Sequence, residues 1–154
     1  MFVHPQPSQK QLSNMYKKSS GYFATSQPDL SKSSSASSTW LHNLLISKGI
    51  KTGTLLDIGC STGQFIYHLK TMGWQVYGID VNAEAVQIGK KHNLEVHAGT
   101  LEDAPYQKNY FDVITMGDTI EHVPSPRQLL TFSYDLLGKD GILFINTPNA
   151  KCGF

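Results

Sequence analysis

Short apolar runs alternate with amphipathic stretches along the chain from about residue 38 onward. Each run has the length of a strand and carries β-branched or aromatic residues, which predicts five strands: TLLDI, WQVYGID, LEVHAG, YFDVITMG and GILFINT. Strands separated by helices form parallel sheets whose right-handed crossovers cover both faces. The pattern therefore predicts an α/β fold, a three-layer α/β/α sandwich with a mostly parallel sheet.

The amphipathic stretches predict the helices. A first helix is expected from Ser38 or Thr39 to about Gly49, with Trp40 and Leu41 on its apolar face. The remaining helices are expected in GQFIYHLKTMG, in NAEAVQIGKKHN with Asn82 as its cap, and from Pro126 to Gly138.

Residues 1–38 lack this periodicity and are rich in Ser, Gln and Pro, as linkers are. They are expected to form a flexible N-terminal arm, or a lid whose Tyr16, Tyr22 and Phe23 fold over a ligand. Residues 39–154 are then expected to form the one folded domain, for which the chain of 154 residues is long enough.

Charge and cysteine content limit which partners and which cellular compartment are expected. The formal net charge of +1 provides no strong field for nucleic acid or an anionic membrane, so neither is expected as a partner. With 2 cysteines, no disulfide framework is expected. The start of the chain does not resemble a secretory signal, and no apolar run has the length of a membrane span. These features favour a cytoplasmic protein.

The stretch LLDIGCSTGQF, at the end of the first predicted strand, is the first candidate site. Ligands of open α/β sheets bind at the carboxyl ends of the strands, near the point where the strand order reverses. Gly59 and Gly63 permit positive φ and let a ligand lie against the backbone, and Ser61 stands where a third glycine is expected. A tight turn also fits a dinucleotide site, a serine nucleophile or simple chain geometry.

Asp80 ends the second predicted strand, about twenty residues beyond the glycines, which is the separation at which an acid binds a ribose. One carboxylate accepts hydrogen bonds from both hydroxyls of a vicinal diol. Alone, Asp80 could instead cap the next helix. Together with the glycine loop it favours a nucleoside cofactor, and it disfavours a nucleophilic Ser61, which would leave Asp80 unexplained.

Five ordered motifs resemble those of class I S-adenosylmethionine-dependent methyltransferases: LLDIGCSTGQF, VYGIDVN, HAGTLEDAPY, FDVITMGDTIEHVPSP and LLGKDGILFINTPN. The resemblance runs from about Thr54 to Asn149 and is closest to the branch with Glu-His-Val after the fourth strand, which includes ubiquinone-pathway O-methyltransferases. It implies a Rossmann-like fold, S-adenosyl-L-methionine as cofactor, and methyl transfer to a small-molecule acceptor at oxygen.

The resemblance also implies the cofactor-binding residues. They are Asp57, Gly59, Cys60, Ser61 and Gly63 around the methionine part, Asp80 at the ribose, Val81, Thr100, Leu101 and Glu102 around the adenine, and Gly117 beside the transferred methyl group. Thr100 departs from the family, which often has an acid there. The Leu101 backbone or the Glu102 carboxylate is then expected to take that contact.

Glu121 and His122 are the implied catalytic residues. A hydroxyl acceptor must lose its proton during methyl transfer, and an imidazole can accept or orient that proton. In related O-methyltransferases an acid-x-x-Glu-His segment binds a divalent cation, and Asp118 completes this pattern here. A cation is the less favoured interpretation, because the same pair shapes acceptor pockets in members without a metal. No metal ligand is assigned.

The chain ends soon after the fifth predicted strand, at TPNAKCGF, where this class usually continues. The domain is therefore expected to be truncated after that strand, without its usual C-terminal part. The fifth strand would form an apolar edge, which a second copy of the chain or a partner chain would cover. The alternative function is a module or partner subunit that binds the cofactor but is catalytically incomplete.

Overall fold

The computed structural model describes residues 29–32 and 35–148. Helices and strands alternate along this part of the chain, as the sequence predicts. In chain order the elements are η2 (Leu30–Lys32), α2 (Ala36–Ser47), β1 (Thr54–Ile58), α3 (Gln64–Thr71), β2 (Gln75–Asp80), α4 (Ala83–Lys91), β3 (Glu95–Ala98), β4 (Phe111–Gly117), η3 (Ile120–His122), α5 (Pro126–Leu136) and β5 (Leu137–Asn146). No helix within these residues is both long and apolar enough to cross a membrane.

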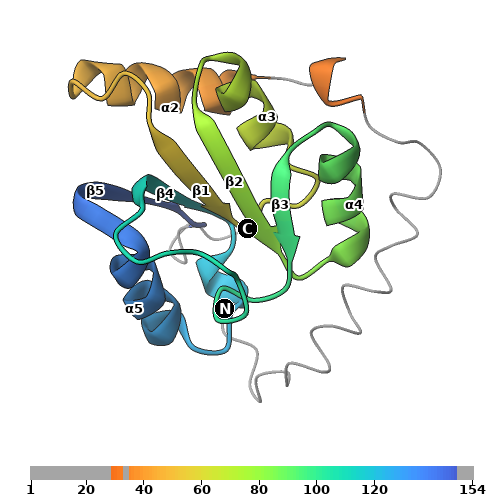
Figure 1. Cartoon of the computed structure of the whole chain (residues 1–154), viewed down its shortest axis with the longest axis vertical. Coiled ribbons are helices and arrows are strands. Elements are labelled where there is room, and N and C mark those ends of the chain that lie inside the picture. The colour runs from red at the N-terminus through yellow and green to blue at the C-terminus, as the bar shows by residue number, and fades with distance from the viewer. Residues whose placement is uncertain (1–28, 33–34, 149–154) are drawn as a thin grey trace.

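All neighbouring strands pair in parallel, in the order β3-β2-β1-β4-β5 (Figure 1). The chain moves outward from β1 through β2 to β3, then crosses to the other side of β1 to form β4 and β5. The strand order thus reverses between β1 and β4, which is where ligands bind in open α/β sheets. The predicted Rossmann-like α/β fold class is confirmed.

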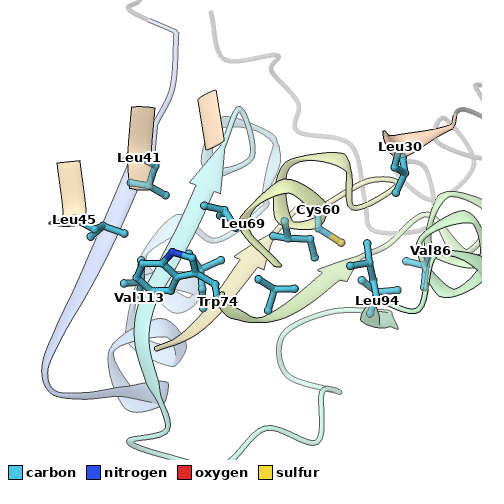
Figure 2. Packing of buried hydrophobic residues seen from close by; sticks show 13 residues of the cluster. Leu30, Leu41, Leu45, Cys60, Leu69, Trp74, Val86, Leu94 and Val113 are labelled. Atoms are coloured by element: carbon cyan, nitrogen blue, oxygen red, sulfur yellow. The ribbon is translucent and has the colours of Figure 1, made fainter. Parts of the chain in front are cut away.

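Two clusters of buried side chains hold the helices against the sheet. The first lies on the face covered by η2, α2, α3 and α4, and includes Leu41, Leu45 and Leu69 (Figure 2). The second lies under α5 and the connection from β3 to β4, and includes Phe111 and Met116. Because both faces are covered, the central strands are apolar at successive positions instead of alternating with polar residues.

The first long helix begins earlier than the sequence predicted. α2 starts at Ala36, ahead of the expected Ser38 or Thr39, and Leu30 is fully buried in the first cluster. Burial of Leu30 holds this segment against the helices, while the boundary between an arm of residues 1–38 and a domain of residues 39–154 stays a prediction. The rest of the expected arm or lid lies outside the described residues.

β5 also differs from the prediction. The strand begins at Leu137, directly after α5 ends at Leu136, whereas Gly138 was expected to end the helix. The register of β5 against β4 shifts between Phe111 and Val113, so the strand starts irregularly. Every residue of β5 is half-buried or exposed, and the strand is last in the sheet order. Within the described residues, β5 is therefore an edge strand.

Candidate functional site

A cavity of about 710 Å³ opens at the carboxyl ends of β1 and β4, where the strand order reverses. Its walls come from the loop after β1, the ends of β4 and β5, and the first turns of α2. This volume lies in the range of small-molecule sites. The predicted site residues that line it are Asp57, Gly59, Cys60, Ser61 and Gly117.

The glycine loop wraps around the end of β2. The backbone N–H groups of Gly59 and Cys60 both donate to the Ile79 carbonyl, at 2.8 and 3.1 Å. The N–H of Ser61 donates to Asp80 Oδ2 at 2.7 Å. The loop and the acid that the sequence placed in one site are therefore joined directly, although 19 positions separate Ser61 from Asp80.

Three loop residues adopt positive φ: Gly59 at 83°, Ser61 at 50° and Gly63 at 79°. A Cβ on Gly59 would overlap the side chain of Thr119, and a Cβ on Gly63 would lie 2.5 Å from Leu94 Cδ1. Both positions favour glycine for its conformation, and at Gly59 the Thr119 side chain also leaves no space for a Cβ. Ser61 takes the conformation that glycine favours, in agreement with its predicted place in the motif.

The side chain of Cys60 belongs to the core of the domain. It is buried in the first core cluster, and burial raises the pKa of its thiol. The thiol is therefore a small packing group, and only the backbone of this residue belongs to the predicted cofactor loop.

Asp57 is a buried acid at the base of the cavity. Its side chain is 7% exposed, and Thr115 Oγ1 donates a hydrogen bond to Asp57 Oδ1 at 2.7 Å. Burial raises the pKa of Asp57 to about 7, against the opposing effect of the Thr115 hydrogen bond, and the negative charge of Asp80 adds to the rise. A cationic group in the cavity would favour the ionised form of this carboxyl.

Asp80 uses its two carboxylate oxygens to hold the backbone. Oδ1 accepts from the N–H of Asn82 at 2.8 Å, while Oδ2 accepts from Ser61. The cap of α4 is Asn82, whose side chain accepts from the N–H groups of Glu84 and Ala85 at 3.0 and 3.2 Å. The alternative role of Asp80 as a helix cap is thus filled by another residue, and each carboxylate oxygen retains capacity for a further donor.

The residues predicted around the adenine lie outside the cavity walls. Val81 is 54% exposed beside Asp80. Thr100 Oγ1 donates to Asp103 Oδ2 at 2.7 Å, so its hydroxyl closes a local turn, while Glu102 is exposed. Leu101 packs against the second core cluster, which leaves its backbone as the group available to a ligand.

The segment after β4 closes one side of the cavity. Asp118 lines the cavity with φ at 48°, and its N–H donates to the Asn146 carbonyl at 2.9 Å. Thr119 Oγ1 lies 3.1 Å from the Ile58 carbonyl and 2.9 Å from that of Gly117, and can donate to either. These hydrogen bonds fix the segment to the ends of β1 and β5.

Glu121 and His122 do not line the cavity. Glu121 Oε2 accepts from Thr147 Oγ1 at 3.1 Å, and its buried Oε1 has no hydrogen-bond partner. His122 Nε2 lies 3.9 Å from that oxygen, and the His122 side chain is 58% exposed. Among residues 29–32 and 35–148, no group of three or more His, Cys, Asp or Glu is placed to hold a metal ion.

Several cavity residues were not predicted as site residues. They are Ser37, Trp40, Gln64, Phe65, Thr115, Phe144 and Asn146. Thr115 carried a signal, because it is a polar residue within the apolar run of β4, and it pairs in register with Asp57. The aromatic residues carried no such signal, because an aromatic residue in an apolar stretch is equally typical of a core position.

The chain matches proteins of known family. The profile of the family described as methyltransferase domain matches residues 32–154. A ubiquinone biosynthesis O-methyltransferase from Glaesserella parasuis is 35% identical over 106 residues, which cover 62% of this chain and 45% of that protein. One from Yersinia enterocolitica is 33% identical over 112 residues, covering 67% and 46%. The chain thus spans about half the length of these curated relatives.

Solved structures share the fold. A putative S-adenosyl-L-methionine-dependent methyltransferase from Methanococcus maripaludis gives a TM-score of 0.64 at 19% identity, covering 94% of this chain and 66% of that chain. The cyclase SpnF gives 0.70 at 21% identity, covering 94% and 61%. The profile match over most of the chain and the conserved fold agree: the chain belongs to the methyltransferase domain family, in the class I, S-adenosylmethionine-dependent type.

Proposed function

We propose that the protein transfers a methyl group from S-adenosyl-L-methionine to a small-molecule acceptor, at oxygen. The observation that carries this proposal is the joining of the glycine loop to Asp80 beside a cavity that also holds Asp57 and Gly117. The ubiquinone biosynthesis O-methyltransferases that match the chain support a small-molecule acceptor and oxygen as the methylated atom.

The residues present fit this cofactor. Asp57 offers a carboxylate for the ammonium of the methionine part, and Gly59 and Ser61 of the glycine loop line the cavity beside it. Asp80 would accept hydrogen bonds from the ribose hydroxyls, and the exposed Val81 would pack on the adenine. A Cβ built on Gly117 meets nothing within 4 Å, which leaves room beside it for the transferred methyl group.

The bound sulfonium supplies an electrophilic methyl group, so the chain has chiefly to position the acceptor and receive a proton. His122 would accept or orient that proton, with Glu121 as the carboxylate beside it. Since neither lines the cavity, the acceptor would have to extend toward η3 to meet them. Asp118, which does line the cavity, is a second carboxylate that could orient a hydroxyl.

Two measurements test the proposal. Titration calorimetry should show binding of S-adenosylhomocysteine and none of NAD, and binding of NAD alone would contradict it. Transfer of labelled methyl from S-adenosyl-L-methionine into a phenol-containing small-molecule extract should follow, with EDTA leaving the rate unchanged. The structure of SpnF, a cyclase, shares this fold, so the fold alone does not establish methyl transfer. Cofactor binding without any transfer would therefore favour the catalytically incomplete module.

The affinity for S-adenosylhomocysteine is expected to depend on pH through Asp57. Its raised pKa of about 7 means that the unliganded protein is most stable when this carboxyl is protonated, and loses that stability as pH rises through about 7. A cofactor ammonium favours the ionised carboxyl instead. Calorimetry should therefore show affinity rising roughly tenfold from about pH 6 to about pH 7.5. Asp57→Asn should remove this dependence, and an unchanged profile in that variant would contradict the assignment.

Gly117→Leu is expected to block the cavity while leaving the domain folded. A side chain here enters open space, so the thermal midpoint should stay within about 2 °C of that of the unmodified protein. The added volume should weaken binding of S-adenosylhomocysteine about tenfold or more. Gly117→Ala is the graded control and should give a smaller loss. Full affinity in the leucine variant would place the methyl group elsewhere.

A further inference from the structure

We propose that Trp40 and Phe144 form the acceptor wall of the cavity and select acceptors with a planar ring. Trp40 comes from α2 and Phe144 from β5, and both side chains line the cavity. Their ring centroids are 5.5 Å apart, with an angle of 57° between the planes. This inference rests on the proposed function, and it adds the residues that recognise the acceptor.

Trp40 lies outside the buried contacts of α2 with the core. Its side chain is 56% exposed, whereas Leu41 and Leu45 on the same helix are each 2% exposed and belong to the first core cluster. A large aromatic side chain at the edge of a cavity offers apolar area at little cost in conformational freedom. Besides its contact with Phe144, the Trp40 ring therefore has exposed surface that a bound molecule can contact.

The strand order assigns this wall to the acceptor. The predicted cofactor contacts follow β1 and β2, at Asp57, the glycine loop and Asp80. β5 lies on the opposite side of β4 from these strands, so Phe144 borders the part of the cavity that the cofactor leaves open. Gly117, beside which the methyl group is expected, stands at the end of β4 between the two parts.

The polar groups at this wall suit a ring that carries a hydroxyl. Asp118 and Asn146 line the same cavity and are tied together by the hydrogen bond from the Asp118 N–H to the Asn146 carbonyl. A planar ring can stack on or meet the edge of an aromatic pair, and such contacts contribute beyond the area they bury. A saturated ring lacks a π-face, so it would keep the apolar contact with these rings but lose the added contribution of an aromatic pair.

Two probes that differ in planarity test the inference: catechol and trans-cyclohexane-1,2-diol carry the same pair of neighbouring hydroxyls. Each is titrated by calorimetry into the protein saturated with S-adenosylhomocysteine. Catechol is expected to bind and the saturated diol to bind at least fivefold more weakly. Trp40→Ala and Phe144→Leu should each weaken catechol about fivefold and leave the affinity for S-adenosylhomocysteine within twofold. Phe144→Leu keeps apolar volume on β5, so the variant is expected to fold.

Tyr134→Ala is the matched control, because Tyr134 is an aromatic residue that is 78% exposed and does not line the cavity. It should leave both affinities unchanged. Equal binding of the two probes, no binding of catechol, or full catechol affinity in both wall variants would each overturn this inference while S-adenosylhomocysteine still binds. Failure of S-adenosylhomocysteine to bind the unmodified protein would instead overturn the proposed function, and this inference with it.

Discussion

Replacing Asp80 with alanine is expected to lower the affinity for S-adenosylhomocysteine by about 100-fold or more. The substitution removes the proposed acceptor for both ribose hydroxyls, and hydrogen bonds to a charged group contribute about 1.5–3 kcal/mol each. It also removes the partner of the Ser61 N–H, which Asp80 Oδ2 holds at 2.7 Å, and of the Asn82 N–H. The glycine loop would thus lose an anchor as well as a ligand contact. Calorimetry of the folded variant measures the loss.

Two further variants separate the contributions in this prediction. Asp80→Asn retains one acceptor oxygen but not the charge, and should give an intermediate affinity. Asp135→Ala removes an acid of α5, which pairs with Lys108 at 2.8 Å and does not line the cavity. This control should bind S-adenosylhomocysteine as tightly as the unmodified protein. An affinity within threefold of normal for Asp80→Ala would refute the ribose assignment.

The sequence was most informative where the chemistry is local. The glycines and Asp80 were predictable because a strand-to-helix turn with positive φ has few solutions, and because parallel strands end at the same edge of a sheet. The hydrogen bond from Ser61 to Asp80 was not predicted, but it joins the two segments that these facts place together. Asp57 was predictable by its place at the end of β1, but its raised pKa was not, because burial of its side chain depends on the packing around it.

Contacts set by strand register and side-chain direction could not be predicted in the same way. Thr115 meets Asp57 across 58 positions of sequence, through the pairing of β1 with β4. Trp40 was expected to share the buried face of Leu41, yet successive helix residues point about 100° apart, and packing of Leu41 on the sheet turns Trp40 toward the cavity edge. Periodicity cannot choose between these two directions when both residues are apolar.

The side-chain directions in η3 could not be predicted from periodicity either. The motif placed Glu121 and His122 after the fourth strand, as found, but it did not fix where their side chains point. The backbone there follows from the positive φ of Asp118 and the hydrogen bonds of Thr119, neither of which has a periodic signature. The predicted catalytic role of the pair therefore depends on an acceptor that reaches beyond the cavity walls.

Gly59→Ala is expected to destabilise the domain by about 3 kcal/mol. Part of the cost is conformational, because φ is 83° at this residue, and a left-handed conformation costs about 1–2 kcal/mol for a residue with a Cβ. The rest is steric, because the new Cβ would overlap the side chain of Thr119, and overpacking costs about 1–3 kcal/mol. Urea denaturation with an unchanged slope would measure the loss as a lower midpoint.

Gly49 provides the matched control, because its φ is 85° but a Cβ there meets nothing within 4 Å. Gly49→Ala should therefore show only the conformational cost of about 1–2 kcal/mol. Thr119→Ala should relieve the steric cost of Gly59→Ala in the double variant, with a coupling free energy of about 1–2 kcal/mol, and should show no coupling to Gly49→Ala. Equal losses at the two glycines, or an absence of coupling to Thr119, would show that the segment after β4 does not constrain the glycine loop. If the coupling is found, the loop proposed to bind the cofactor is energetically coupled to the segment that carries Asp118, Glu121 and His122.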